Sequence, residues 1–215
     1  MNSPSILLSA TFASYAILVA LAAGRATRAP LAALAWLVIT GGLGISGLLL
    51  NFDSFPPPVL RLVFPTLLVT AIVCCSSLAR PWLERWSLAG MIAFQAFRLP
   101  LELIMHQAAR EGVMPPQMTF TGRNFDILTG LLAIPLALLT ARVPKAVIWL
   151  WNLGGLALLI NVVGVAILSV PGPYRAFFQE PANLWIGHAP FVWLPAVLVP
   201  LALAGHILVA RKLLT

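Results

Sequence analysis

The chain has 215 residues, of which 60% are hydrophobic and only 9% are charged, and its mean hydropathy is +0.98. Soluble globular domains carry about 25% charged residues, so this composition excludes a water-soluble particle. The net charge is +7, but Lys and Arg occur singly or in pairs between apolar segments, which argues against a nucleic-acid-binding surface. The sequence therefore predicts an all-α integral membrane protein, with a single transmembrane domain over residues 1–215.

Apolar stretches recur along the chain and are separated by Pro, Gly and charged residues. A spanning helix needs about 20 mostly apolar residues, and about seven stretches meet this requirement. The predicted spans are Ile6–Ala23, Leu31–Leu50, Leu60–Ala79, Ser87–Gln107, Phe125–Ala141, Ala146–Val170 and Ala189–Ala210. They predict a polytopic transmembrane helix bundle.

The first span ends in Ala20-Leu21-Ala22-Ala23-Gly24, a pattern also found at signal-peptide cleavage sites. A signal peptide carries basic residues before its apolar run. Here Arg25 and Arg28 follow the run, and the residues before Ile6 contain neither Lys nor Arg. We therefore expect a retained first helix.

Small residues in the second and sixth spans predict close helix contacts, because they let backbones approach each other in lipid. The small and amide residues concerned are Gly41, Gly42, Gly44, Ser46 and Gly47 in the second span, and Asn152, Gly154, Gly155, Asn161 and Gly164 in the sixth. Cys74 and Cys75 in the third span are adjacent, so a disulfide between them would be strained, and we expect them to be packing residues.

The fourth span carries Arg98, Glu102 and His106 at successive four-residue steps. Each step advances about 6 Å and drifts about 40° around a helix, so the three side chains form one stripe. A charge at the centre of a span costs about 2.5–3.5 kcal/mol on the insertion scale, so a partner is expected. The simplest hypothesis is an Arg98–Glu102 ion pair that joins helices, formed directly or through one shared partner, and Pro100 predicts a kink.

Further polar residues lie at the outer end of the same span or at the start of the fifth and seventh spans, which favours a functional site. Asn124 and Asp126 are also typical of helix starts, and Asp126 can alternatively turn inward toward Arg98 or Arg123. The candidate polar site, in a cavity lined by the fourth, fifth and seventh spans, consists of Arg98, Glu102, His106, Arg123, Asn124, Asp126 and His188. His206 lies about 27 Å beyond His188 along a helix, so we expect it to be structural.

Metal binding has only weak support. Two histidines and two carboxylates (Glu102, His106, Asp126 and His188) are an acceptable zinc or manganese set, but no His-Glu-x-x-His motif occurs. The sequence also contains no nucleophile elbow, phosphate loop, Cys-x-x-Cys pair or c-type haem motif. Catalytic residues and cofactors are therefore left open, except that a retinal Schiff base is excluded because the last span has no lysine before Lys212.

The basic residues predict the orientation, because short cytoplasmic loops are enriched in Lys and Arg. They follow the first, third, fifth and seventh spans as Arg25 and Arg28, Arg80 and Arg85, Arg142 and Lys145, and Arg211 and Lys212. This pattern places the amino terminus outside and the carboxyl terminus in the cytoplasm, with the polar site opening to the periplasm.

Three segments resemble an uncharacterised group of small bacterial polytopic inner-membrane proteins. They are Phe97–His106, with Arg98-Leu99-Pro100-Leu101-Glu102; Met118–Gly130, with Thr121-Gly122-Arg123-Asn124-Phe125-Asp126; and Pro190–Pro195, followed by Pro200 and His206. The resemblance implies a bacterial inner-membrane location and no established activity. The chain also loosely resembles seven-helix membrane hydrolases that hold zinc through His, Asp and Ser, but the paired histidines of their last helix are missing here.

Three functional classes follow from these observations. The favoured class is small-molecule binding or transport, in which Arg98 receives an anionic or polar solute while Glu102, His106 and Asp126 titrate. The second is a membrane-embedded enzyme, metal-dependent or not, that acts on a lipid-type substrate with Glu102 or Asp126 as general base. The third is a structural partner of a membrane complex. We expect the bilayer, and a small-molecule or lipid ligand, as partners, and the oligomeric state is left open.

Overall fold

The computed structural model describes residues 2–215, and these residues form helices and connecting segments without strands. The helices are α1 Ile6–Ala26, α2 Pro30–Ser46, α3 Pro58–Cys75, α4 Arg80–Arg85, α5 Leu88–Phe94, α6 Arg98–Arg110, α7 Ile127–Leu139, α8 Lys145–Ile167 and α9 Val199–Leu214. A 3₁₀ turn at Gln95–Phe97 joins α5 to α6, and a π-helix at Leu194–Leu198 leads into α9. The all-α prediction is confirmed for this part of the chain.

Five helical segments are long and apolar enough to cross a membrane: Ile6–Ala26, Pro58–Cys75, Leu88–Arg110, Lys145–Ile167 and Leu194–Leu214. The apolar helices α2 and α7 are shorter, with 17 and 13 residues. A helix of 13 residues is about 20 Å long, whereas the hydrocarbon core of a bilayer is about 30 Å thick. The structure thus fits a multi-pass membrane protein, and seven full spans stay a prediction.

Local chemistry explains where the helices depart from the predicted boundaries. The second span was expected to reach Leu50, but α2 ends at Ser46 because Gly47 adopts a left-handed backbone conformation with φ of 75°. Pro100 cannot donate a backbone hydrogen bond to the residue four positions earlier, and the 3₁₀ turn at Gln95–Phe97 lies there. The predicted irregularity in the fourth span is therefore present just before α6.

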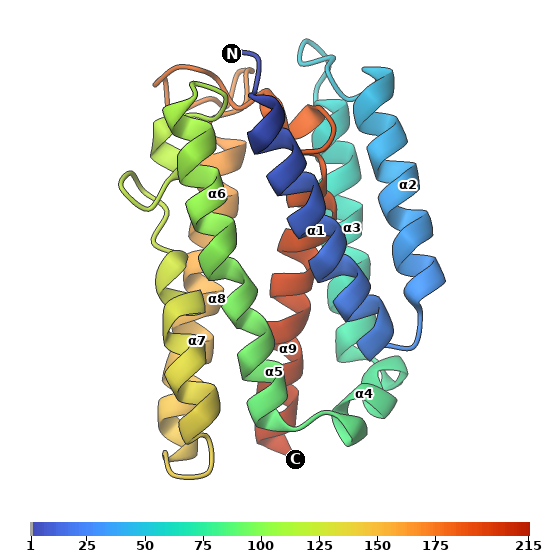
Figure 1. Cartoon of the computed structure of the whole chain (residues 1–215), viewed down its shortest axis with the longest axis vertical. Coiled ribbons are helices and arrows are strands. Elements are labelled where there is room, and N and C mark those ends of the chain that lie inside the picture. Colours follow the sequence, from blue (N-terminus) through green and yellow to red (C-terminus); the bar gives the residue numbers. More distant parts are fainter. Residues whose placement is uncertain (1) are drawn as a thin grey trace.

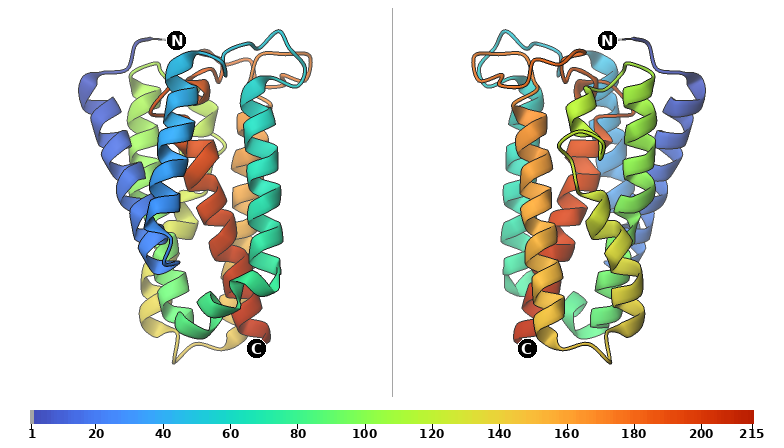
Figure 2. Two further views of the ribbon diagram at one scale, coloured as in Figure 1. Left: turned by 90° about the vertical axis from the view of Figure 1, so that its right-hand side faces the viewer. Right: turned by 90° about the vertical axis from the view of Figure 1, so that its left-hand side faces the viewer.

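The bundle is built around α9, which packs against α3, α5 and α8. Figure 1 shows the amino terminus at one end of the bundle and the carboxyl terminus at the other, with α4 lying across the lower end. The two views of Figure 2 place α1 and α2 on one side of α9 and α7 and α8 on another. Of the helices in residues 2–215, α9 has the fewest exposed residues, because the other helices surround it.

The connection between α6 and α7 is folded into the protein. Val113, Met114 and Met118 are almost completely buried. The Arg123 N–H donates to Gln117 O at 2.9 Å, and other backbone groups of this segment are bonded in the same way. Non-helical backbone at membrane depth is tolerated only when it is buried in protein or lines a cavity. This folded connection, visible in Figure 2, brings the start of α7 beside α6.

Candidate functional site

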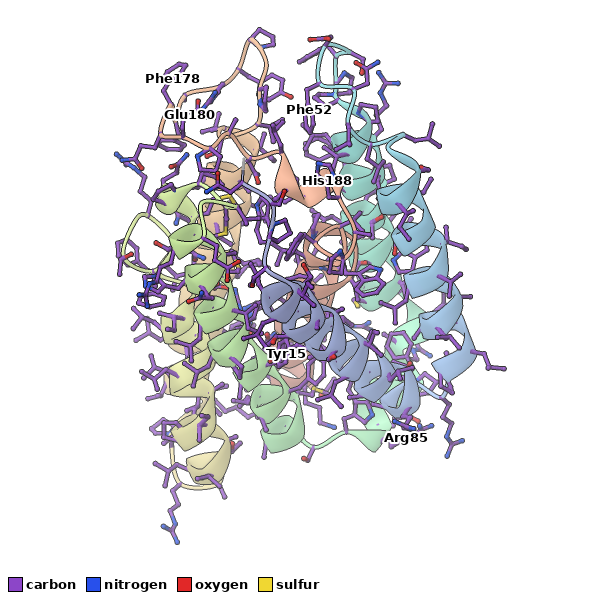
Figure 3. The ribbon with its side chains drawn as sticks, turned by 45° about the horizontal axis from the view of Figure 1, so that its top comes forward. Tyr15, Phe52, Arg85, Phe178, Glu180 and His188 are labelled. Atoms are coloured by element: carbon purple, nitrogen blue, oxygen red, sulfur yellow. The ribbon has the colours of Figure 1, made fainter. Side chains whose placement is uncertain are left out.

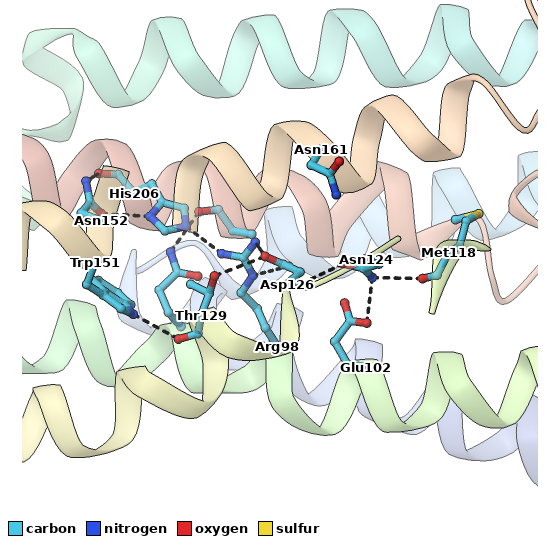
Figure 4. A network of polar contacts seen from close by, with 12 residues as sticks. Arg98, Glu102, Met118, Asn124, Asp126, Thr129, Trp151, Asn152, Asn161 and His206 are labelled. Carbon is cyan, nitrogen blue, oxygen red and sulfur yellow. Dashed lines mark hydrogen bonds and ion pairs between the residues drawn. The ribbon is translucent and has the colours of Figure 1, made fainter. Parts of the chain in front are cut away.

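A buried ion pair joins α6 to the start of α7. Arg98 Nε donates to Asp126 Oδ2 at 2.6 Å, and Arg98 Nη2 donates to Asp126 Oδ1. Arg98 is 1% exposed and Asp126 is 5% exposed. The expected Arg98–Glu102 pair was therefore wrong, because Asp126 occupies the guanidinium (Figure 4). Of the two positions considered for Asp126, the inward one toward Arg98 is observed.

The other side of the guanidinium meets α9. Arg98 Nη1 lies 2.7 Å from His206 Nε2, and His206 Nδ1 lies 2.9 Å from Asn152 Oδ1. Because an arginine nitrogen only donates, Nε2 accepts, so Nδ1 carries the proton and donates to Asn152. Asn152 Nδ2 in turn donates to the His206 carbonyl at 3.1 Å. His206 was expected to lie apart from the site, and the structure places it inside the network instead.

Glu102 has a different partner, Asn124. Asn124 Nδ2 donates to Glu102 Oε2 at 2.8 Å and to Met118 O at 3.0 Å. Asn124 Oδ1 accepts from the Asp126 N–H at 2.9 Å, just before α7 begins. Asn124 is fully buried and Glu102 is 2% exposed. Asn124 therefore bonds to the N-cap residue Asp126 and does not itself cap α7 as expected. It links the Glu102 carboxyl to the Arg98–Asp126 pair (Figure 4).

A cavity of about 60 Å³ borders this network. Arg98, Glu102 and Asp126 are among the residues around it, but its exposed wall is almost entirely apolar and includes Leu60, Val63, Leu159, Val162 and Leu198. Sites for drug-sized ligands measure about 300–1,000 Å³, so this cavity accommodates only a small group. Its walls come mainly from α3, α6, α8 and the α9 segment. Of the expected lining, the fourth span (α6) and the seventh span (α9) are present, whereas the fifth span contributes only Asp126 and α3 and α8 take its place.

Four predicted site residues do not line the cavity; one of them, Asn124, is bonded to Glu102, and the other three lie elsewhere. His106 stacks on Phe120 with ring centroids 4.7 Å apart. The Arg123 guanidinium lies 4.9 Å from the centre of the Phe177 ring. His188 lies at the end of the bundle opposite Arg85 (Figure 3), and partial burial lowers the pKa of its imidazole.

The weak metal candidates are not gathered into a ligand set. Within residues 2–215, no group of three or more His, Cys, Asp and Glu side chains is placed to hold a metal ion. Asp126 and Glu102 are instead bonded to Arg98 and Asn124.

Two glycines allow the helices of the network to approach closely. A Cβ at Gly155 would lie 2.6 Å from His206 Cε1, and a Cβ at Gly130 would lie 2.6 Å from the Leu99 backbone nitrogen. α8 therefore meets α9 at Gly155, and α7 meets α6 at Gly130. The glycines and Asn152 of the sixth span were the sequence signal for this contact, although they did not identify His206 as the partner.

The geometry can be compared with known proteins. A family model described as a domain of unknown function (DUF8737) matches residues 57–214. This range contains the whole network, from Arg98 to His206, and all the residues that line the cavity. No curated protein and no solved structure matches the chain.

Proposed function

The chain belongs to the DUF8737 family, and we propose that it is a multi-pass membrane protein that binds a small ligand, or moves it across the membrane, at Glu102 in the intramembrane cavity. We further propose that it resides in a bacterial inner membrane, with its amino terminus outside. The orientation rests on the positive-inside rule, because the basic pairs within or after the last turns of α1, α3, α7 and α9 share one end of the bundle.

The observation that carries the proposal is the carboxyl of Glu102. Glu102 is one of the residues around the cavity, it is almost fully buried, and among residues 2–215 the one hydrogen-bond partner of its carboxyl is the amide of Asn124. Burying a carboxylate is costly unless it is paired. Glu102 is therefore suited to bind a proton, a small cation or an ammonium group.

Placing the ligand at Glu102 changes the role that the sequence suggested for Arg98 in small-molecule binding or transport. Arg98 was expected to receive an anionic solute, but its donors are directed at Asp126 and His206. The guanidinium is better suited to hold α6, α7 and α9 together beside the cavity. Glu102 then becomes the group that meets the ligand.

Irregular helices beside the cavity support ligand binding or transport. The 3₁₀ turn ends at Phe97 and the π-helix contains Leu198, and both residues line the cavity. Broken helices line the substrate sites of many transporters, and π-helical turns are frequent at functional sites. A bundle that served only as a structural partner would not require these interruptions.

Labelling with the apolar reagent dicyclohexylcarbodiimide tests the proposal. This reagent attacks protonated carboxyls in apolar surroundings and forms a stable N-acylurea, which peptide mass spectrometry locates. We expect modification of Glu102, protection by small amines such as methylammonium, and little modification of Asp126, which is held by Arg98. Glu102→Gln should remove the modification, whereas the matched change Glu180→Gln in an exposed loop should leave it.

Two outcomes would contradict the proposal. The first is equal modification of Asp126 and Glu102, which would mean that the ion pair does not distinguish them. The second is an unmodified Glu102 in a protein that a thermal-unfolding assay shows to be folded.

A further inference from the structure

A second hollow lies at the end of the bundle that carries the basic pairs. One cavity of about 590 Å³ lies among α1, α3, α4, α5 and α9, and a neighbouring cavity of about 620 Å³ extends to α2. Thr27, Thr70, Trp82 and Ala204 line both cavities, which therefore form one continuous hollow, here called the basal crevice. It shares no lining residue with the cavity at Glu102.

The interior of the basal crevice is mostly apolar. Side chains such as Val69, Val73 and Leu201 form its walls, and its threonines are already bonded. Thr27 Oγ1 donates to Ala23 O at 2.9 Å and Thr70 Oγ1 donates to Thr66 O at 2.8 Å. Each of the two cavities exceeds the roughly 300 Å³ at which ligand sites begin. The interior thus suits a long apolar chain better than a polar solute.

The rim of the basal crevice is basic and aromatic. Arg85 lines it, is exposed, and donates through Nη1 to Ala26 O at 3.3 Å. Trp82 and Trp86 stack beside it with ring centroids 6.3 Å apart. Tryptophan is enriched where membranes meet water. Figure 3 shows Arg85 on α4, the short helix that Figure 1 shows lying across this end of the bundle.

We propose that the basal crevice binds an anionic phospholipid, with an acyl chain among α1, α3 and α9 and the phosphate at Arg85. The charge complementarity rests on an excess of basic residues at this end, since Arg25, Arg28 and Arg80 are also exposed here beside the single acid Glu84. Basic pockets between membrane helices on the cytoplasmic side bind anionic head groups. The proposal is independent of the ligand at Glu102.

Native mass spectrometry of the full chain in mild detergent tests the assignment. The probe is phosphatidylglycerol with palmitoyl and oleoyl chains, and phosphatidylcholine with the same chains is the matched lipid. Arg85→Gln should weaken phosphatidylglycerol binding about fivefold, the effect of one basic residue near an anionic surface. Arg142→Gln removes one charge from the α7–α8 loop, outside the crevice, and should leave binding unchanged.

A second variant tests the chain-binding part. Ala204→Phe places a ring in the region that both cavities share, and it should weaken binding of both lipids without changing the response to Arg85→Gln. Glycerophosphoglycerol, which has the head group but no chains, should not bind detectably. Equal affinity for the two lipids, equal loss with Arg142→Gln, or tight binding of glycerophosphoglycerol would each overturn the proposal.

Discussion

Arg98 and Asp126 form a two-point ion pair inside the bundle, 28 positions apart in the chain. Arg98 is the first residue of α6, and Asp126 immediately precedes α7. The pair therefore determines how the folded connection between these helices returns to α6. His206 on α9 accepts a hydrogen bond from the same guanidinium, through Nη1.

Removing one member of this pair should be strongly destabilising. Asp126→Leu or Arg98→Leu leaves one buried charge without compensation, at a cost of about 3–5 kcal/mol. The double variant Arg98→Leu, Asp126→Leu removes both charges and should recover most of the loss. Thermal unfolding and folded yield in detergent measure these effects, and a double variant as unstable as the sum of the two single variants would disprove the pairing.

Asn124 should contribute far more to stability than the exposed amide of Asn161. Asn124→Ala leaves Glu102, the Met118 carbonyl and the Asp126 N–H without their partner. Each buried group left unpaired costs about 1–3 kcal/mol. Asn161→Ala removes a bond to Arg123 O at an exposed position and should change stability by about 0.5 kcal/mol or less. Equal effects in denaturant unfolding would contradict the linking role of Asn124.

Adjacent glycines in α8 provide a matched test of the contact with α9. Gly155→Ala would bring a methyl group within 2.6 Å of His206 Cε1 and 2.7 Å of Thr129 Cγ2, whereas Gly154 has no neighbouring atom within 4 Å of its Cβ position. Overpacking of this kind costs about 1–3 kcal/mol, and Gly154→Ala should be tolerated. A shift in melting temperature confined to Gly155→Ala is expected, and equal shifts would place the contact elsewhere.

The amino-terminal segment should loosen in acid because of Glu111, which lies just beyond α6. Hydrogen bonds from Gln107 and then from Ser5 lower the pKa of its carboxyl. Because the pKa is lower in the folded protein, the bonds between Ser5 and the ionised Glu111 stabilise the amino-terminal segment above the ordinary glutamate pKa of about 4.3. This stabilisation is lost as the pH falls through the lowered pKa.

A spin label at Ser3→Cys, in a protein that also carries Cys74→Ala and Cys75→Ala, reports the amino-terminal segment alone. Its electron paramagnetic resonance spectrum should become more mobile below about pH 4. Glu111→Gln should show the mobile spectrum at neutral pH with little further change. An identical pH profile in the two proteins would mean that Glu111 does not hold the segment.

Reporter fusions test the orientation. Fusions after Ala79, Ala141 and Thr215 should report cytoplasm, because basic pairs lie near these positions: Arg80 and Arg85, Arg142 and Lys145, and Arg211 and Lys212. The fusion after Ala141 is the most informative, since α7 has only 13 residues. A periplasmic signal there would show that α6 and α7 do not together cross the membrane twice.

Much of the site's composition was predictable, but its pairing was not. Arg98, Glu102, Asn124 and Asp126 stand out because charged and amide residues are rare in apolar spans. Spacing along one helix suggested Glu102 as the partner of Arg98, four residues away. The observed partner comes from a connection whose path depends on long-range packing, for example the 3.0 Å bond from Gln117 Nε2 to Ser169 Oγ. His206 was missed because no local pattern links it to a residue 108 positions away.

The sequence by itself determined the membrane class and the approximate position of every apolar helix, because bilayer solvation depends on composition over windows of about 20 residues. It also determined which connections are basic. Only the tertiary structure decided that α7 is short, that Arg98 pairs with Asp126 across 28 positions, and that the cavity is walled by α3 and α8. These features depend on where helices cross, and helix crossings are set by complementary surfaces such as Gly155 against His206.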